Sequence, residues 1–343
     1  GTGNIARNHI KSYMKNENVE VYAFCDIDKD ILEEAGKEFG IDRLYTDKDE
    51  LLKLPEIDAV SVCTWNSAHA PCAIAALNAG KHVICEKPMA TNVSDAIAMK
   101  EAAEKSGKLL MIGFVRRFGN DYKILSDFVN QDYLGEIYYT KATYLRRNGN
   151  PGGWFGDKSR SGGGPLIDLG VHVIDFVRYT MGNPKPVSAY GVTFEKLYDR
   201  NNLKTPKGYV SKSKTDNDIC DVEDLASALI RFDNGAALSV ETSFSLNIKE
   251  DKGEIEFFGT KGGARISPEL ELYTETNGYM ADVTLKAKTA LSFDGLFENE
   301  INHFVDCVVN GTECKSPAED GIEIMKILTA IYQSAETGHE VIL

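Results

Sequence analysis

Strand, helix and strand follow one another in KHVICEKPMATNVSDAIAMKEAAEKSGKLLMIGF, residues 81–114. Apolar runs predict strands over 81–85 and 108–114, and the alanine-rich residues 92–106 predict a helix that Gly107 ends. Two strands that a helix joins lie parallel in one sheet, and such strands are apolar without alternation because both faces are buried. The stretch therefore predicts one unit of a parallel sheet.

The same alternation precedes this unit in the chain. Strands are predicted over residues 19–25 and 58–64, and helices over residues 28–39 and 71–79. Strict alternation of strands and helices indicates a parallel sheet that helices cover on both faces. We assign these elements to a first domain of α/β class, residues 1–114.

The first six residues, GTGNIA, fit the phosphate-binding pattern G-x-G-x-x-A where a helix begins. Asp26 stands 20 residues after Ala6, at the end of the strand predicted over 19–25. The glycines allow a tight turn, the helix N-terminus offers N–H groups to a pyrophosphate, and the aspartate can accept hydrogen bonds from the ribose hydroxyls. A carboxylate there repels a 2′-phosphate, so NAD is favoured over NADP. The predicted cofactor-binding residues are Gly1, Thr2, Gly3, Asn4, Ile5 and Asp26.

Two points about this motif stay open. Asp26 has the alternative role of an aspartate that only caps a turn. The turn normally follows a strand, and the numbered chain has no residue before Gly1. We therefore expect that the numbering begins inside the motif and that an apolar first strand of the sheet is missing upstream.

Length and composition limit the classes of function. A chain of 343 residues exceeds the size at which one core usually stops growing, which predicts two domains. The net charge of −14, without a basic stripe, argues against a nucleic-acid partner. No apolar run nears the roughly 18 residues that cross a bilayer and no signal peptide is visible, so we expect a cytoplasmic protein with no membrane partner. Seven cysteines without a C-x-x-C pair argue against a zinc site or a disulfide framework, and we expect no metal.

The second predicted domain covers residues 115–343, where the strict alternation stops. Successive strand-like runs, with Asn234-Gly235 as a tight hairpin turn, predict a large and mostly antiparallel sheet. The polar residues 199–221 predict a long loop that overhangs the cleft or points toward a neighbour. A broad sheet with an uncovered face predicts a homodimer or homotetramer. Strands are predicted over 136–146, 224–232 and 236–246, a hairpin-like pair of strands over 254–266, and closing helices over 296–310 and 318–337.

Several motifs, in the same order along the chain, resemble those of the Gfo/Idh/MocA family of oxidoreductases. They are the glycine turn at 1–6, Thr64-x-Asn66-x-x-His69, Glu86-Lys87-Pro88, Gly113-Phe114-x-Arg116-Arg117-Phe118 and SGGGPLIDLGVHVID at 161–175. The resemblance implies an N-terminal Rossmann domain and a nicotinamide cofactor. It also implies a C-terminal α/β domain whose sheet forms the substrate cleft and often an oligomer interface. Trp65 departs from the pattern, because the family usually has proline there.

The resemblance also implies the site residues. Carried over by position, the catalytic set is Lys87, Asp168 and His172. The implied cofactor contacts are Thr64, Asn66 and His69, and further candidates for cofactor or substrate contacts are Glu86, Lys87 and Arg116. Trp154 stands just ahead of the glycines at 162–164, where it either lines the nicotinamide or sugar ring or packs in the core.

These residue types suit the oxidation of an alcohol. Asp168 and His172 are four apart in a helix predicted over 165–181, so both side chains lie on one face. Histidine titrates near neutrality and suits removal of the hydroxyl proton as hydride leaves the carbon. Lys87 follows the strand over 81–85, at the sheet edge where ligands bind, and can stabilise charge on the reacting oxygen.

Each assignment has an alternative. A single histidine on an amphipathic helix is often solvated or part of the core, and a lysine is most often a surface charge. The three glycines at 162–164 indicate a close backbone approach, either to a ligand or to another chain segment. Under a metal-binding alternative, the ligands are Asp168, His172, Asp175 and His69.

The function predicted from these patterns is NAD-dependent oxidation of a secondary alcohol in a sugar, cyclitol or related polyol. One alternative keeps the cofactor without net redox: transient oxidation of a sugar enables an elimination or hydrolysis, and the hydride is then returned. A second alternative is a non-catalytic NAD-binding sensor. The joint presence of Lys87, Asp168 and His172 argues against the sensor, which has no need of an acid/base set.

Overall fold

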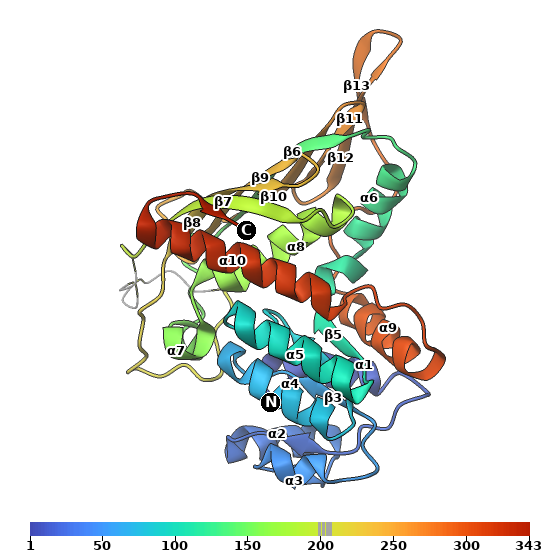
Figure 1. Ribbon diagram of the computed structural model, residues 1–343, viewed down its shortest axis with the longest axis vertical. Helices are drawn as coiled ribbons and strands as arrows, with labels where there is room; N and C mark the ends of the chain where they lie inside the picture. The colour runs from blue at the N-terminus through green and yellow to red at the C-terminus, as the bar shows by residue number, and fades with distance from the viewer. Residues whose placement is uncertain (198–199, 201–202, 204–207) are drawn as a thin grey trace. The chain divides into compact units, whose positions relative to one another are not determined.

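The computed structural model describes residues 1–197, 200, 203 and 208–343 (Figure 1). The chain forms two compact units, of which the first holds Gly1–Val115 with Asp294–Met325 and the second holds Arg116–Phe293 with Lys326–Leu343. The division by sequence placed residues 294–325 in the second domain. They belong to the first unit because helix α9, Leu296–Asn310, packs on helix α1 there.

The first unit consists of parallel strands that alternate with helices. Strands β3, β4 and β5 lie parallel in that order, with Val60 beside Val83 and Ile84 beside Met111. Strands β1 and β2 form a separate parallel pair. The elements are α1 Asn4–Tyr13, β1 Phe24–Cys25, α2 Lys29–Phe39, β2 Leu44–Tyr45, α3 Lys48–Leu52, β3 Ala59–Val62, α4 His69–Asn78, β4 His82–Glu86, α5 Val93–Ser106 and β5 Leu110–Gly113.

Local signals in the sequence fix the helix ends of the first unit. The side chain of Asp28 accepts hydrogen bonds from the N–H groups of Asp30 and Ile31, which caps α2. Asn92 caps α5 in the same way through the N–H of Asp95. These two helices therefore start where the sequence places a short polar acceptor.

The strand predicted over residues 19–25 is wrong in its extent. Within that described stretch, only Phe24–Cys25 pairs with another strand, which is Leu44–Tyr45. A β-branched and aromatic run favours extended structure, but a strand also needs a partner for its N–H and C=O groups. The pattern therefore overestimated the strand by five residues at its N-terminal side.

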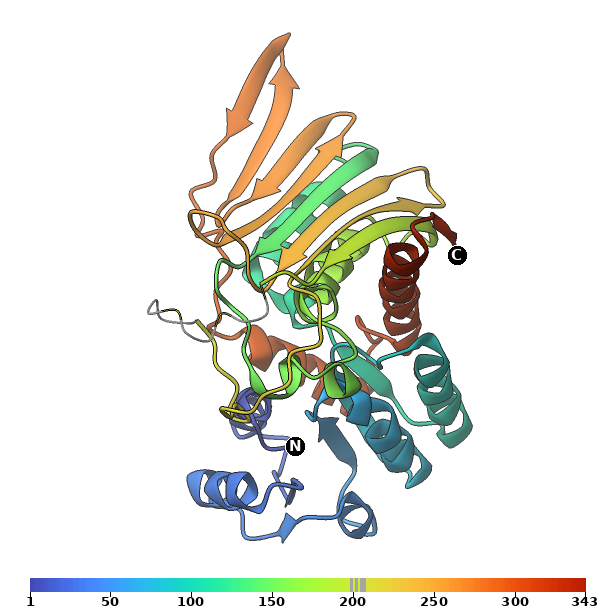
Figure 2. The ribbon, with the colours of Figure 1, turned by 90° about the vertical axis from the view of Figure 1, so that its left-hand side faces the viewer.

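The second unit is built on a nine-stranded sheet, whose strands lie side by side in Figure 2. The order is β13-β12-β11-β10-β6-β9-β8-β7-β14, and every neighbouring pair is antiparallel except β6 and β9. This confirms the predicted α/β class with a large and mostly antiparallel sheet. The elements are α6 Asn120–Asn130, β6 Ile137–Leu145, α7 Lys158–Ser161, α8 Val171–Thr180, β7 Pro186–Phe194, β8 Leu225–Phe232, β9 Ala237–Ser243, β10 Lys252–Gly259, β11 Gly262–Ile266, β12 Leu270–Thr276, β13 Tyr279–Val283 and β14 Val341–Ile342, with α10, Ala318–Thr337, running into it from the first unit.

The hairpin predicted at Asn234-Gly235 joins β8 to β9. Gly235 has a φ of 86°, which glycine adopts without steric cost, and its N–H donates to the carbonyl oxygen of Phe232 at 3.0 Å. The tight turn sets the register of the two strands, in which Ile230 stands opposite Leu238. Both of these side chains are fully buried.

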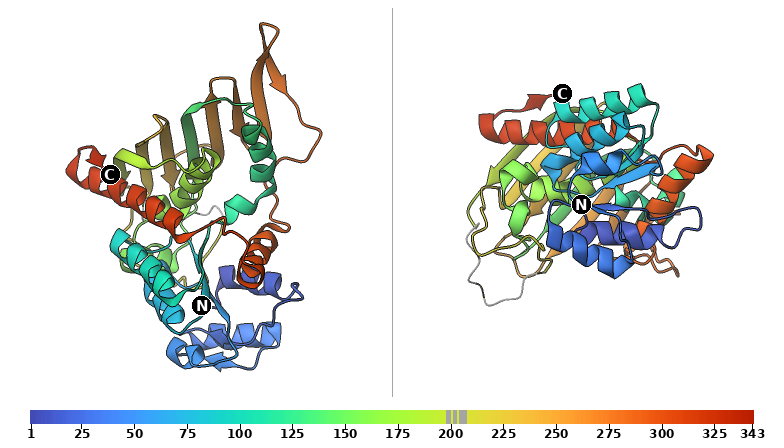
Figure 3. Two further views of the ribbon diagram at one scale, coloured as in Figure 1. Left: turned by 45° about the vertical axis from the view of Figure 1, so that its right-hand side comes forward. Right: turned by 90° about the horizontal axis from the view of Figure 1, so that it is seen from below.

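Helix α8 and the C-terminal part of α10 cover one face of this sheet (Figure 3). The ring of Phe176 on α8 lies 6.4 Å from that of Phe257 on β10. The N–H of Gly191 on β7 donates to Ser334 Oγ on α10 at 2.9 Å. These contacts bury one face of the sheet and hold α8, which carries part of the predicted site, against the strands.

Two further predictions concern irregular segments. The helix predicted over 165–181 is two elements, because Leu166–Gly170 forms a π-helical turn before α8 begins. The predicted loop over 199–221 has no helix or strand among its described residues, and 199, 201–202 and 204–207 lie outside the description. None of the described helices combines the length and the apolarity that a membrane crossing needs.

Candidate active site

The glycine turn lies between the ends of β1 and β3 in the first unit. The Gly1 nitrogen donates to the carbonyl oxygen of Cys25 at 2.8 Å. A Cβ at Gly1 would stand only 2.4 Å from the carbonyl oxygen of Cys63. A Cβ at Gly3 would meet no described atom within 4 Å, and no described side chain caps the N-terminus of α1. The turn therefore fits a pyrophosphate, whose oxygens would accept hydrogen bonds from N–H groups at the start of α1.

Asp26 holds this turn against the end of β1. Its Oδ2 accepts hydrogen bonds from the N–H of Thr2 at 2.7 Å and from Thr2 Oγ1 at 3.2 Å. Its Oδ1 accepts from the N–H of Asp28 at 2.9 Å. Asp26 thus has the turn-capping role that was the alternative to ribose binding. Among the described residues, Oδ1 accepts only the bond from Asp28 and can accept another, so ribose binding stays a prediction.

Trp65 keeps the conformation of the proline that it replaces in the family pattern. Its φ of −72° and ψ of 159° lie in the region that a proline ring imposes. A single 3₁₀ turn, Asn66–Ala68, follows and leads directly into α4 at His69. A proline could therefore adopt the same backbone conformation at this position.

His69 joins that turn to the segment after β4. Its Nδ1 lies 2.7 Å from the carbonyl oxygen of Pro88, and its Nε2 lies 3.1 Å from that of Thr64. Burial lowers the pKa of His69, so the ring is neutral and its single N–H serves the shorter contact, to Pro88. Within the structure, His69 positions two loops, and its contact with a cofactor stays a prediction.

Lys87 stands just past the carboxyl end of β4, and the Lys87–Pro88 peptide bond is cis. The N–H of Lys87 donates to Glu86 Oε2 at 3.2 Å, and Glu86 Oε1 accepts a hydrogen bond from His9 Nε2 at 2.9 Å. A Cβ at Gly113 would approach the side chain of Glu86 to 3.2 Å. The buried Glu86 carboxylate therefore packs against α1 and β5 and fixes the backbone at Lys87.

Glu300 on α9 completes a buried trio with His9 and Glu86, which the sequence did not predict. One ligand-type atom from each of the three lies within 4.8 Å of the others. Glu300 is fully buried, and neither of its carboxyl oxygens has a hydrogen-bond partner among the described residues. The three residues come from distant parts of the chain, so no local motif signals the trio.

Burial and charge together set the protonation of this trio. Burial lowers the pKa of His9, but Cys63 and Glu86 raise it, and the pKa lies well above its ordinary value. Burial raises the pKa of Glu86, but the hydrogen bond and charge of His9 outweigh burial and lower the pKa. Burial and the charge of Glu86 raise the pKa of Glu300 to about 8. At neutral pH, an ion pair of His9 and Glu86 thus lies beside a protonated Glu300.

Asp168 and His172 lie on consecutive turns in the second unit. Asp168 belongs to the π-helical turn, in which the N–H of Val171 donates to the carbonyl oxygen of Leu166, and His172 belongs to the first turn of α8. A π-helical turn is wound more widely than an α-helix and occurs often at functional sites. The prediction of one regular helix is therefore corrected, because the angle between the two side chains differs from that of an α-helical four-residue spacing.

Glu223 caps the helix that carries Asp168 and His172 from outside, and the sequence did not identify it. Its Oε2 accepts the N–H of Gly164 at 2.9 Å, and its Oε1 accepts the N–H of Leu166 at 3.1 Å and the hydroxyl of Tyr332 at 2.8 Å. Burial raises the pKa of Glu223, which is 4% exposed. The carboxyl group pairs N–H groups that a helix start leaves without partners.

The glycines at 162–164 allow that approach. A Cβ at Gly163 would stand 2.1 Å from the Tyr332 hydroxyl, and a Cβ at Gly164 would stand 2.3 Å from the carbonyl oxygen of Glu223. Of the two interpretations of the glycine run, the structure therefore shows the close passage of another chain segment.

Two arginines of the family motif are held inside the second unit. Arg117 Nε donates to Asp175 Oδ2 at 3.0 Å, and its guanidinium lies 4.1 Å from the centre of the Tyr179 ring. Arg116 donates to the buried Asp121 at 2.6 Å. Arg116 thus fixes the start of α6, and its contact with a cofactor stays a prediction.

The metal-binding alternative finds no support in these contacts. Both carboxylate oxygens of Asp175 face the guanidinium of Arg117. Among the residues that the structure describes, two groups place histidine, cysteine or carboxylate atoms closely enough for a metal, and neither includes Asp168 or His172. The groups are His9, Glu86 and Glu300, and His303, Cys307 and Cys314.

Trp154 belongs to an aromatic cluster in the second unit. Its ring stacks on Phe155 with centroids 3.9 Å apart, and Phe155 meets Tyr209 edge-on at 6.1 Å. The described part of the loop after β7 lies along this cluster, where Ser213 Oγ accepts the N–H of Trp154 at 3.3 Å. Trp154 thus packs against an aromatic neighbour within the second unit. Its contact with a nicotinamide or sugar ring stays a prediction.

A cavity of about 410 Å³ lies elsewhere in the second unit, beside α6 and the end of α8. Its lining includes Tyr122, Glu136, Tyr179 and Asn234. No predicted site residue lines this cavity. This cavity is therefore separate from the predicted site residues.

Comparisons with known proteins agree with the fold and the motifs. Residues 1–114 match the family described as "Oxidoreductase family, NAD-binding Rossmann fold", and residues 127–343 match "Oxidoreductase family, C-terminal alpha/beta domain". These matches confirm the resemblance drawn from the motifs, because together they cover most of the chain.

Individual relatives are sugar and inositol dehydrogenases by name. The chain is 36% identical over 344 residues to D-glucoside 3-dehydrogenase of Escherichia coli (strain K12), covering 99% of this chain and 95% of the relative. It is 30% identical over 262 residues to myo-inositol 2-dehydrogenase of Thermotoga maritima, covering 76% and 72%. Levoglucosan dehydrogenase, solved in complex with NADH and L-sorbose, has a TM-score of 0.85 at 25% identity, covering 100% of this chain and 96% of that chain.

Proposed function

Because the chain belongs to the Gfo/Idh/MocA family of NAD-binding oxidoreductases, we propose that it oxidises a secondary alcohol of a sugar, cyclitol or related polyol. By name, the relatives act on a D-glucoside and on myo-inositol, and a third was solved with L-sorbose. The observation that carries the proposal is the retention of Lys87, Asp168 and His172 at the positions that the motifs assign to catalysis. A chain that only sensed a nucleotide would not need this set.

NAD would bind along the carboxyl edge of the parallel strands in the first unit. The turn at residues 1–5 would hold the pyrophosphate of NAD, and Asp26 would bind the adenosine ribose. The Asp26 carboxylate favours NAD over NADP, because it can accept a hydrogen bond from a free 2′-hydroxyl but repels a 2′-phosphate. Thr64, Asn66 and the backbone at Lys87 border the same edge. The bound cofactor would supply the acceptor for the hydride.

The residues of this chain would then accept the proton of the substrate hydroxyl and stabilise the charge on the substrate oxygen. A nitrogen of the His172 imidazole takes the proton of the substrate hydroxyl as the carbon loses hydride, which leaves a carbonyl group. The ammonium group of Lys87 stabilises the negative charge that grows on the substrate oxygen. Asp168 binds a substrate hydroxyl or orients the imidazole.

NADH absorbance with the purified protein tests the proposal across glucosides, inositols and anhydrosugars. We expect NADH to accumulate with at least one of these substrates. Product without NADH would instead support transient oxidation without net redox. Tight NAD binding without turnover of any compound would support the sensor, and either result overturns the proposed dehydrogenase.

Substitution Lys87→Met tests the role of the ammonium group. We expect turnover to fall by about a hundredfold or more, because one preorganised charge on the reacting oxygen is removed, with little change in NAD binding. The matched control is Lys105→Met, since Lys105 is an exposed lysine on α5. Unchanged turnover in Lys87→Met would refute the assignment.

A further inference from the structure

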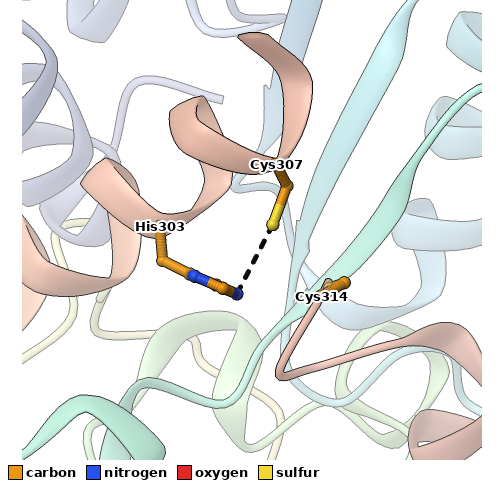
Figure 4. A group of neighbouring side chains, drawn as sticks. All are labelled: His303, Cys307 and Cys314. Atoms are coloured by element: carbon orange, nitrogen blue, oxygen red, sulfur yellow. Dashed lines mark hydrogen bonds between the residues drawn. The ribbon is translucent and has the colours of Figure 1, made fainter. Parts of the chain in front are cut away.

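A histidine and two cysteines gather at the C-terminal end of α9, outside the residues assigned to catalysis (Figure 4). His303 and Cys307 stand four residues apart on this helix, and Cys314 follows on the segment between α9 and α10. His303 Nε2 lies 3.4 Å from Cys307 Sγ, and the three potential ligand atoms lie within 4.8 Å of one another.

We propose that His303, Cys307 and Cys314 bind a zinc ion, with water as the fourth ligand. Zinc takes a tetrahedral set in which Zn–S is about 2.3 Å and Zn–N about 2.0 Å, so that neighbouring ligand atoms lie roughly 3.5–3.8 Å apart. The observed separation of 3.4 Å between Nε2 and Cys307 Sγ already matches one edge of this tetrahedron. A shift of about 1 Å or less in the segment that carries Cys314 brings the other edges into range.

The histidine ring presents its lone pair to the cluster. The N–H of Lys315 donates to His303 Nε2 at 3.0 Å, so Nε2 is an acceptor and the ring proton belongs on Nδ1. This tautomer is the one that binds a metal through Nε2. Zinc would take the place of the Lys315 N–H at that nitrogen.

Contacts within the chain fix the turn that carries Cys314. Gly311 ends α9 with a φ of 70°, which turns the chain back toward the helix. Asp306 accepts hydrogen bonds from Asn310 Nδ2 at 2.6 Å and from Thr312 Oγ1. These contacts hold the turn that brings Cys314 beside His303, so the ligand set is preorganised.

The chemistry of the donors selects the metal. Two sulfur ligands and an imidazole favour zinc over magnesium or calcium, which prefer oxygen. Binding releases the two thiol protons and involves no change of oxidation state. The sequence pattern argued against a zinc site because the spacing is H-x₃-C-x₆-C, which contains no C-x-x-C pair.

Zinc at this position would tie α9 to the edge of the parallel sheet. Just beyond Cys314, the carbonyl oxygen of Ser316 accepts the N–H of Ile112 at 2.9 Å, and Pro317 bridges to Met111 on β5. The proposed site is therefore structural for the first unit, and no step of the dehydrogenase reaction passes through it.

Cobalt titration of the reduced, chelator-treated full-length chain tests the proposal. We expect one equivalent of Co²⁺ to bind with a thiolate-to-cobalt charge-transfer band and intense tetrahedral d–d bands, and Zn²⁺ to displace it. Cys314→Ser and His303→Gln should each weaken binding by more than about a hundredfold, since even changes outside the ligand shell cost roughly ten- to a hundredfold. Both positions are only partly buried, so these variants retain the fold.

The matched control is Cys220→Ser, because Cys220 is a partly buried cysteine of the second unit. It should keep the cobalt spectrum and the affinity of the unaltered chain. Zinc should raise the melting temperature of the unaltered chain and of Cys220→Ser, but not that of Cys314→Ser. Weak octahedral bands without charge transfer, or an unchanged spectrum in Cys314→Ser and His303→Gln, would overturn the proposal.

Discussion

Glu300 is a carboxyl group that the protein surrounds completely and leaves without a hydrogen bond among its described neighbours. The free-energy cost of burying this group is limited, because its raised pKa keeps the carboxyl group neutral at neutral pH beside the ion pair of His9 and Glu86. The folded state thus binds this proton more tightly than the unfolded chain does. The favourable contribution is complete below an ordinary glutamate pKa of about 4.3 and is lost as the pH rises through about 8.

Substitution Glu300→Gln should flatten this dependence on pH. Between about pH 6 and about pH 9, we expect the unaltered chain to lose roughly 1–3 kcal/mol more unfolding free energy than the variant, at about 1.4 kcal/mol per pKa unit. Urea denaturation at the two pH values measures the difference. Glu298→Gln on the same helix is the control, because Glu298 is only partly buried in its ion pair with Lys15. Equal losses in the unaltered chain and Glu300→Gln would contradict the argument.

Asp26→Asn tests the assignment of the ribose site. The amide keeps the size of the side chain but removes the charge that favours a free 2′-hydroxyl over a 2′-phosphate. We expect NAD affinity to fall by about tenfold and the preference over NADP to narrow, as measured by fluorescence titration with the reduced cofactors. Asp28→Asn, which alters only the cap of α2, should leave both affinities unchanged.

The residues that the sequence predicted share contiguous motifs, and those it missed do not. Lys87 belongs to a triplet beside a strand, and Asp168 and His172 belong to one run of fifteen residues. Glu223 and Glu300 take their positions from contacts across the fold, which no local pattern encodes. Candidate site residues were therefore predictable from contiguous motifs, and their roles stay predictions, whereas the groups that position them required the three-dimensional structure.

The helix that carries Asp168 and His172 depends on Glu223, which pairs two N–H groups at its start. Glu223→Ala should lower the free energy of unfolding by about 2–4 kcal/mol, because three buried donors lose their acceptor. Turnover should fall more than NAD affinity does, since Asp168 and His172 lie on this helix and the pyrophosphate turn does not. Tyr332→Phe removes one of the three hydrogen bonds and should cost only about 1 kcal/mol. Equal effects of the two variants would contradict a capping role.

Helices and strands were predictable wherever the apolar residues kept one regular spacing along the whole element. The strands and helices of residues 58–114 followed from apolar runs and glycine stops. Strand β7 was missed because Pro186 and Gly191 interrupt its pattern, and helix α6 was also not predicted. The π-helical turn was not predicted, because apolar residues spaced about four apart are compatible with both an α-helix and a π-helix.

The open face of the nine-stranded sheet is the feature of the second unit that points beyond a single chain. Tyr190 and Leu229 stand directly opposite each other on β7 and β8, with 48% and 44% of their surfaces exposed. Adjacent exposed apolar side chains on a sheet mark an interaction surface. We propose that a second copy of the chain covers this face, which gives a homodimer or homotetramer.

Leu229→Lys tests this assembly, because a charge placed in the exposed apolar pair of Tyr190 and Leu229 is costly to bury. We expect light scattering after size exclusion to show an oligomer for the unaltered chain and a monomer, or an oligomer at least about tenfold weaker, for the variant. Met14→Lys adds the same charge at an exposed apolar position of the first unit and should leave the assembly intact. A monomeric unaltered chain would rule out the proposal.

The π-helical turn before α8 makes chain length itself a determinant of the site. Each residue in that turn advances less around the axis than a residue of an α-helix does. Deletion of Leu169 would restore α-helical winding and rotate Asp168 relative to His172, although every reactive side chain would still be encoded. Small insertions and deletions at this point thus offer relatives a route to new substrate preferences that comparison of catalytic residues alone would not reveal.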